Sequence, residues 1–308
     1  MKAEAVLPSY SHRDRTIEVY RRAVTRVIDH LTENLGEDHT LKDMANVAML
    51  SPFHFNRIFR EITGVSPVRY LYALRIAKAQ HLILTTRLKV IDICYAVGYN
   101  SLGSFNNRFV SLVGHSPRCI RSLAANVDPA DLRHLIDGRE NPKVQNRREP
   151  CSIWGRVDVP ADFSGAVMVA LFPGPPSNTY PVASVLADNG FYALPPVHRA
   201  GDFFITAVGL VWHEQMTDFL LQPECLRAAM PPIHLTPSGL SSPVDFHLAP
   251  RQPIDPPVPP SLAFLLVDQF VRLPDEVPKK DVRTSPFFVA RSYAEPSGLS
   301  SQRLREGL

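Results

Sequence analysis

Residues 41–67 read LKDMANVAMLSPFHFNRIFREITGVSP, and residues 90–117 read VIDICYAVGYNSLGSFNNRFVSLVGHSP. The second stretch repeats the pattern of the first about fifty residues later, with one extra residue in its turn. The recurring residues are Ser51, Phe55, Phe59, Gly64, Ser66 and Pro67, which return as Ser101, Phe105, Phe109, Gly114, Ser116 and Pro117. Each copy predicts a short helix, a small-residue turn and a second helix opened by a serine cap.

The second helix of the first copy has clear start and stop signals. Ser51 offers a capping hydroxyl, and the proline after it fits the first helical position, where its missing N–H costs nothing. Apolar residues then recur at three- and four-residue spacing and predict one buried stripe, and Gly64 ends the helix. The stripe consists of Phe55, Ile58, Phe59 and Ile62.

A longer helix is predicted to join the two copies. It runs from Pro67 to Thr85 and reads as amphipathic, with a length of about 27 Å at about 1.5 Å per residue. With the width of a unit at each end, this helix suits two recognition helices about one duplex turn, roughly 34 Å, apart.

The second copy has the same organisation. Gly98 lies in its turn, Ser101 is the expected cap, and Gly114 closes the helix. Its stripe is formed by Phe105, Phe109 and Leu112, and Cys94 occupies the small-residue position that Ala45 fills in the first copy. We interpret these phenylalanines and Cys94 as core residues. Two helix-turn-helix units in tandem indicate double-stranded DNA as the partner.

The segment from about residue 20 to residue 122 resembles the DNA-binding domain of the arabinose-operon regulator family (AraC/XylS). The resemblance rests on Leu41-x-x-Met44-Ala45, on the two copies above, on Leu74-Arg75-Ile76-x-x-Ala79-x-x-Leu82, on Ile93-Cys94-x-x-Val97-Gly98-Tyr99, and on Arg121. It implies two units that enter successive major grooves and regulate transcription.

Exposed positions in the first two turns of each recognition helix are the candidates for reading bases. Arg57 suits guanine, Asn56 suits adenine, and Phe53 suits a thymine methyl. The full set of predicted base contacts is Phe53, His54, Asn56, Arg57, Leu102, Gly103, Asn106 and Asn107. Because Leu102 and Gly103 offer no side-chain hydrogen bonds, we expect the second unit to read sequence more weakly.

Predicted phosphate contacts surround these positions and would fix the register without reading sequence. They are Ser51, Arg60, Arg69, Ser101 and Arg108. The charge distribution agrees with this prediction. Residues 1–122 hold 17 Lys and Arg against 10 Asp and Glu, whereas the remaining residues hold 16 against 20. A basic first part supplies salt-dependent attraction to phosphates.

Composition restricts the class of protein. The polar stretch Ser9–Arg22 lacks the apolar core of a signal peptide, and the chain contains no run of eighteen apolar residues that could span a membrane. The four cysteines lie far apart, which favours reduced thiols over disulfides. These features predict a cytoplasmic protein with no membrane contact, associated with the nucleoid when bound.

After residue 123 the helical period gives way to short β-prone runs broken by most of the 29 prolines. We predict a short helix at 129–136, then strands at 152–159, 166–172, 191–194, 203–210, 264–271 and 287–293. The expected fold is therefore an all-α N-terminal domain, with two helix-turn-helix units joined by a linker helix, followed by a C-terminal β-sandwich-like domain.

The predicted boundaries are a tail at 1–19, the AraC-type domain at 20–123, a linker with a short helix at 124–150, a β-rich domain at 151–294 and a flexible tail at 295–308. At this length each domain is expected to have its own core. The runs Gly155-x-Val157, Gly190-Phe191-Tyr192-x-Leu194-Pro195 and Gly201-Asp202-Phe203 are similar to those of transthyretin-like or carboxypeptidase-regulatory-like sandwiches. This similarity implies a fold rather than a function.

The β-rich part contains candidates for an effector pocket but no recognisable catalytic motif. Aromatic and polar side chains of the kind that line such pockets are Trp154, Tyr192, Trp212 and His213. No metal-ligand spacing, cofactor fingerprint or nucleophile motif is found, so we expect no metal, no cofactor and no enzyme activity.

Two functions remain open for the β-rich part. It could sense a small molecule or mediate oligomerisation, or it could dock a protein partner such as RNA polymerase while the chain binds DNA constitutively. Neither the operator, the direction of regulation nor the oligomeric state follows from the residues.

Overall fold

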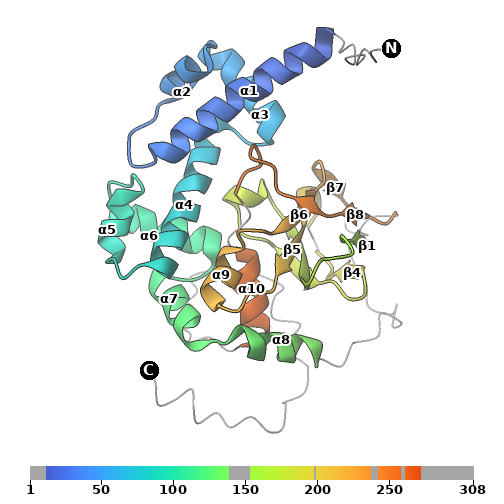
Figure 1. Cartoon of the computed structure of the whole chain (residues 1–308). Helices are drawn as coiled ribbons and strands as arrows, with labels where there is room; N and C mark the ends of the chain where they lie inside the picture. The colour runs from blue at the N-terminus through green and yellow to red at the C-terminus, as the bar shows by residue number, and fades with distance from the viewer. Residues whose placement is uncertain (1–11, 139–152, 198, 237–241, 258–260, 272–308) are drawn as a thin grey trace, which may run out of the picture. The chain divides into compact units, whose positions relative to one another are not determined.

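The first seven helices form two helix-turn-helix units around a shared long helix, and α8 follows them (Figure 1). The computed structural model describes residues 12–138, 153–197, 199–236, 242–257 and 261–271. The helices are α1 (His12–Glu33), α2 (Leu41–Ala48), α3 (Pro52–Thr63), α4 (Pro67–Thr85), α5 (Val90–Ala96), α6 (Leu102–Val113), α7 (Pro117–Asn126) and α8 (Pro129–Asp137). Helix α1 begins within the predicted N-terminal tail.

The capping signals act as predicted. The hydroxyls of Ser51 and Ser101 accept hydrogen bonds from the backbone N–H groups of His54 and Ser104, at 3.4 and 3.2 Å. Gly64 and Gly114 end α3 and α6 in the left-handed conformation, with φ of +77° and +88°. Glycine adopts this conformation without the steric cost of a Cβ.

The predicted core of the first unit is confirmed. Phe55, Ile58 and Phe59 are buried, and Ile62 is half-buried. They pack with α1, α2 and the first turns of α4 in one cluster, and the rings of Phe55 and Phe59 lie 5.4 Å apart. The second unit buries Phe105, Phe109, Leu112 and Cys94 in the same way.

Helix α4 departs from the amphipathic prediction because buried residues occur around most of its circumference. Tyr70 and Leu71 face the core of the first unit, whereas Ile76, Ala79 and Ile83 belong to the core of the second. Buried polar side chains, Arg75 and Gln80, contact other elements. A helix packed on several sides shows no single apolar stripe.

The β-rich part contains two sheets. A three-stranded sheet has the order β4-β1-β8, and a six-stranded sheet has the order β3-β2-β5-β6-β9 with β7 also paired to β5. All pairings are antiparallel except β1 with β8. The strands are β1 (Ile153–Asp158), β2 (Gly165–Phe172), β3 (Ala183–Leu186), β4 (Phe191–Leu194), β5 (Gly201–Val211), β6 (Leu226–Ala229), β7 (Ile233–Leu235), β8 (Phe246–His247) and β9 (Ala249–Pro250).

Four of the predicted strands are confirmed as β1, β2, β4 and β5. The predicted strand at 264–271 is wrong, because Ser261–Phe270 forms helix α10. Its apolar run, buried from Ser261 to Val267, suits a buried helix as well as a buried strand, so periodicity could not separate the two. Helix α9 (Met216–Leu221) was not predicted. The predicted strand at 287–293 and tail at 295–308 lie outside the described residues.

The larger sheet is covered on both faces, which a two-layer sandwich does not predict. One face of β2 and β5, with Val169 and Ile205, packs against β1, β4 and β8. The opposite face, with Met168 and Val208, joins a cluster that also contains α9 and α10 and the core of the second helix-turn-helix unit. The second unit and one face of the larger sheet therefore share a core, and the other face of that sheet packs in a core that lies within the β-rich part.

Candidate nucleic-acid interface

The recognition helix of the first unit, α3, presents an open polar face. Phe53 is 84% exposed, and Asn56, Arg57 and Arg60 are exposed on the same side of the helix. Arg57 forms an ion pair with Glu61 one turn on, at 3.5 Å between Nη1 and the carboxylate, and both side chains of the pair are exposed. Exposed pairs of this kind contribute little, so the guanidinium is available to a stronger acceptor.

His54, a predicted base contact, is not among the exposed residues of α3. Its ring is half-buried and tilted against Tyr20 of α1, with 5.4 Å between centroids. Its Nε2 is enclosed, with no hydrogen-bond partner among the described residues. The predicted phosphate contacts Ser51 and Arg69, in contrast, are exposed at the starts of α3 and α4.

The recognition helix of the second unit, α6, is less open. Gly103, Ser104 and Asn107 are exposed, as is its cap Ser101. Leu102 is half-buried against the core of the second unit. Asn106 is also half-buried, and its side-chain oxygen is enclosed without a partner in the described part of the chain. The exposed face of α6 therefore offers fewer long polar side chains than that of α3.

Arg108 points toward the β-rich part. Its Nη2 donates a hydrogen bond to Oδ1 of Asn178 at 3.0 Å, and its guanidinium lies 5.7 Å from the ring centroid of Tyr72. In the repeat Arg108 corresponds to Ile58, which is buried in the first unit. Both observations place Arg108 on the flank of α6 that faces the β-rich part, where its guanidinium is hydrogen-bonded to Asn178.

Arg75 links the two units and was not identified as functional from the sequence. Its side chain is buried in α4, and it donates to the carbonyls of Leu35, at 3.1 Å, and Glu37, at 2.6 Å, in the loop between α1 and α2. A methyl group on Gly98, in the turn of the second unit, would lie 2.6 Å from its Nη2. Arg75 therefore lies between a loop of the first unit and the turn of the second.

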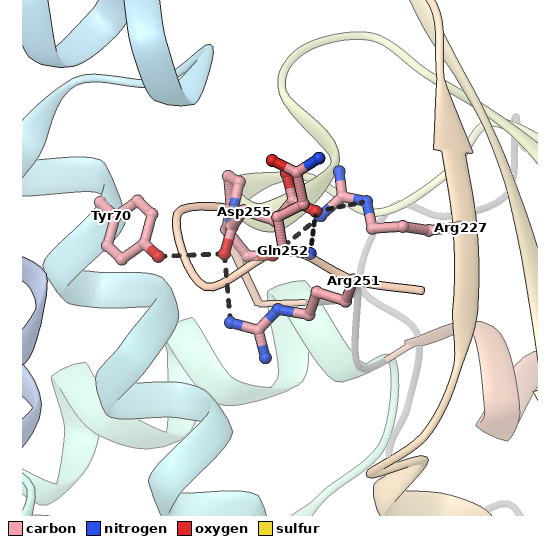
Figure 2. A network of polar contacts seen from close by, with 6 residues as sticks. Tyr70, Arg227, Arg251, Gln252 and Asp255 are labelled. Carbon is pink, nitrogen blue, oxygen red and sulfur yellow. Dashed lines mark hydrogen bonds and ion pairs between the residues drawn. The ribbon is translucent and has the colours of Figure 1, made fainter. Parts of the chain in front are cut away.

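A polar network joins α4 to the β-rich part (Figure 2). The Tyr70 hydroxyl donates to the carbonyl of Asp255 at 3.0 Å, and the Arg251 guanidinium donates to the same carbonyl at 3.1 Å. The Asp255 carboxylate accepts from the backbone N–H of Gln252 at 2.9 Å and lies 3.9 Å from Nε of Arg227. Burial raises the pKa of Tyr70 to about 12, so the hydroxyl keeps its proton at neutral pH.

The four predicted effector residues do not converge on one site. Trp154 is 43% exposed on β1, whereas Tyr192 is buried and donates to the carbonyl of Val244 at 2.7 Å. Burial raises the pKa of Tyr192. His213 is half-buried with its Nε2 enclosed. Trp212 stacks on Phe219 with centroids 5.3 Å apart.

Of these four, Trp212 alone lines a cavity of about 470 Å³. The cavity lies beside the end of α8 and strands β1, β2 and β3, and its walls combine apolar side chains with polar groups, including those of Asp137, Asp188 and Asn189. Its other lining residues are Ile136, Val157, Val159, Phe163, Gly165, Ala166, Val167, Leu186, Ala187 and Gly190. The sequence contains no pattern that marks this set, because it comes from five separate segments: 136–137, 157–159, 163–167, 186–190 and Trp212.

Comparisons with known proteins agree with the helical part. A family model described as a helix-turn-helix domain matches residues 44–122. The transcriptional activator AarP of Providencia stuartii is 32% identical over 98 residues, which are 32% of this chain and 73% of AarP. The chain belongs to the AraC family of transcription regulators.

Other AraC-family relatives match the same share of this chain. The uncharacterised regulator YbfP of Bacillus subtilis is 31% identical over 104 residues, 34% of this chain and 35% of YbfP. An AraC-type regulator structure from Chromobacterium violaceum is 24% identical, with a TM-score of 0.33, and covers 34% of this chain and 95% of that one. The chain spans between about a third and a half of the first curated relatives it matches.

The family model does not extend to the β-rich part of this AraC-family chain. The resemblance of that part to transthyretin-like sandwiches is not confirmed by these comparisons. In the described ranges no helix is long and apolar enough to cross a lipid bilayer.

Proposed function

We propose that this chain binds double-stranded DNA sequence-specifically and regulates transcription, with the first unit as the stronger reader. The observation that carries the proposal is the open face of α3, where Phe53, Asn56 and Arg57 are exposed side by side on a helix capped and packed as a recognition helix. Arg60 and Arg69 flank this face as proposed phosphate contacts, together with Ser51 and Ser101. Gly103, Asn106 and Asn107 are the corresponding proposed contacts of the second unit.

Selection of bound sequences from a random duplex library tests this function. We would use the full chain at about 150 mM salt, where non-specific binding is weak. The expected result is an asymmetric motif with two half-sites about 10 base pairs apart. The proposal is abandoned if no sequence is enriched, either alone or in the presence of a broad panel of metabolites.

Arg57→Ala is expected to weaken binding to the selected operator by about 1–3 kcal/mol and to relax the preference at one base pair of the first half-site. The reason is the loss of a two-pronged guanidinium contact to guanine. Competition binding with each single-base operator variant measures both effects. An equal loss on random DNA would instead identify Arg57 as a phosphate contact.

For the β-rich part we propose that it senses a small molecule in the cavity beside Trp212. The apolar side chains of its walls suit the apolar part of a ligand, and the carboxylates of Asp137 and Asp188 suit hydrogen-bond donors on the ligand, such as amines or hydroxyls. Asp137 also pairs with Arg133 at 3.6 Å in an exposed ion pair, which a cationic group could replace.

Fluorescence can report on this cavity because the chain contains two tryptophans. In a Trp154→Phe background Trp212 is the only one, and the exposed position of Trp154 makes this change mild. We expect amphipathic amines, but not matched carboxylic acids, to change Trp212 emission and to raise the melting temperature. Both responses should disappear in Ala187→Phe in the same background, because the larger side chain occupies part of the cavity and adds no second tryptophan. Responses that persist in this variant would place the ligand elsewhere.

A second candidate function for the β-rich part is the docking of a protein partner such as RNA polymerase. It is favoured by exposed aromatic side chains on the three-stranded sheet, Trp154 and Phe191, which are 43% and 41% exposed. If no small molecule shifts the melting temperature and Trp154→Ala abolishes crosslinking to purified polymerase, this candidate replaces the sensing function.

A further inference from the structure

The two recognition helices have the same length, so each residue of α3 has a counterpart in α6 fifty positions later. Comparing the counterparts shows where the two helices differ. Each begins one residue after a serine cap and ends at a left-handed glycine. At the seventh helical position the first unit has Ile58, which is 4% exposed, and the second has Arg108. A position that the first unit buries in its own core therefore carries a charged group in the second.

The β-rich part supplies the partner of this group. Asn178, in the short 3-10 helix η1 (Pro176–Asn178) that follows β2, is only 9% exposed and accepts from Arg108 at 3.0 Å. The Asn178 side chain has a further hydrogen bond besides the one from Arg108, because its amide nitrogen donates to the Ser177 hydroxyl at 3.0 Å. Its backbone N–H donates to the carbonyl of Pro175 at 2.9 Å. Tyr72 of α4 covers the guanidinium from another side. Charge-assisted hydrogen bonds are among the stronger ones in proteins.

The β-rich part makes a second contact with α6, between Tyr180 and Gly114 at the end of the helix. A methyl group on Gly114 would lie 2.6 Å from the ring of Tyr180, which follows η1 in the chain. The corresponding glycine of the first unit, Gly64, would have no atom within 4 Å of such a methyl group. The segment from Asn178 to Tyr180 therefore contacts the second recognition helix at its middle and at its end.

These contacts leave the reading face of α6 open. Gly103, Ser104 and Asn107, in its first two turns, are exposed while Arg108 and Gly114 are engaged. The geometry therefore allows the β-rich part to remain docked while α6 lies in a major groove. Contact on the flank constrains the orientation of a helix without blocking the residues that read bases.

We propose that Arg108 is a positioning residue, through which Asn178 of the β-rich part orients the second recognition helix for reading DNA. The inference rests on the proposed DNA-binding function and deepens it. It makes the second half-site the one whose recognition depends on the β-rich part. The first half-site does not depend on this contact, because the matching position of α3 is Ile58, which is buried in the core of the first unit.

The test uses the full chain and the operator found by selection. For each variant, the dissociation constant is measured on the intact operator, on one with the first half-site scrambled, and on one with the second scrambled. In Arg108→Ala and in Asn178→Ala, we expect the discrimination at the second half-site to fall about fivefold or more. Discrimination at the first half-site should stay unchanged.

Two further variants separate positioning from charge. Asn178→Asp keeps an acceptor oxygen facing Arg108 and is expected to preserve discrimination at the second half-site. Arg22→Ala removes one positive charge from the exposed pair with Glu18 on α1 and should not distinguish the two half-sites. An equal loss at both half-sites in Arg108→Ala would show a phosphate contact or general destabilisation, and would overturn the proposal.

Hydrogen exchange provides a readout that does not need DNA. Amides of α6 are expected to exchange faster in Asn178→Ala than in the wild-type chain, while those of α3 keep their rates. Unchanged exchange of α6, or tighter binding at the second half-site, would overturn the proposed positioning role. If instead the wild-type chain selects no DNA sequence while α6 exchange responds as expected, the proposed function has failed and the docking contact stands.

Discussion

Arg75→Ala is expected to lower the free energy of unfolding by about 3–5 kcal/mol. The guanidinium makes two hydrogen bonds to backbone carbonyls from a position that is 7% exposed. Hydrogen bonds from charged donors contribute about 1.5–3 kcal/mol each, and their removal leaves the carbonyls of Leu35 and Glu37 without this donor. Urea denaturation followed by circular dichroism measures the loss.

Arg75→Lys and Lys78→Ala are the matched controls. A lysine at position 75 cannot reproduce the two-pronged geometry, so we expect a loss between the wild-type and alanine values. Lys78 lies one turn further along α4 and is exposed, so its removal should change stability by no more than about 0.5 kcal/mol. A loss below about 1 kcal/mol in Arg75→Ala would show that the two hydrogen bonds do not hold α4 against the first unit.

Arg75→Ala also has an expected functional effect. Because Arg75 lies between the loop of the first unit and the turn of the second, its loss should loosen their relative orientation. We expect the variant to discriminate less between operators whose half-sites are separated by one base pair more or less than the selected spacing. Unaltered spacing preference would mean that α4 alone sets the separation.

Gly114→Ala is expected to destabilise the chain by about 1–3 kcal/mol more than Gly64→Ala. Both glycines have positive φ, and a non-glycine residue there costs about 1–2 kcal/mol in either unit. Only at position 114 does the added methyl group meet another part of the molecule, the Tyr180 ring. Overpacking of this kind typically costs about 1–3 kcal/mol.

The two glycines are each other's control, because cap type and helix length are the same. Thermal and urea unfolding of both variants measures the difference, and Tyr180→Leu in the Gly114→Ala background should recover part of it. Equal losses at the two positions would show that Tyr180 yields without cost, and would weaken the case for a contact between the β-rich part and the end of α6.

The helical part was predictable because its signals are local. Caps, left-handed glycines and apolar residues at helical spacing act within one or two turns, so Ser51, Phe55 and Gly64 predicted α3 before any tertiary contact was known. The repeat then predicted α6 by the same reasoning, and the family resemblance followed from both. Alternation and turn residues likewise located β1, β2, β4 and β5.

Contacts between segments that are distant in the chain could not be predicted from these local signals. The apolar run of α10 suits a strand or a buried helix, and packing against the sheet and other helices decided between them. In the repeat Arg108 corresponds to the buried Ile58, so the sequence alone could have shown that Arg108 lies off the exposed face of α6. No sequence pattern indicated its partner Asn178, which is seventy residues away in the chain.

The sequence by itself thus determined two helix-turn-helix units, their caps, their apolar stripes and most of the exposed residues of the first reading face, because each depends on neighbours within a few residues. The tertiary structure alone decided that α4 is buried on several sides, that Arg75 joins the units, and that the β-rich part shares a core with the second unit and engages Arg108. These features depend on which surfaces contact each other after folding. The residue pattern of one segment shows that a face is buried but does not show which distant segment covers it.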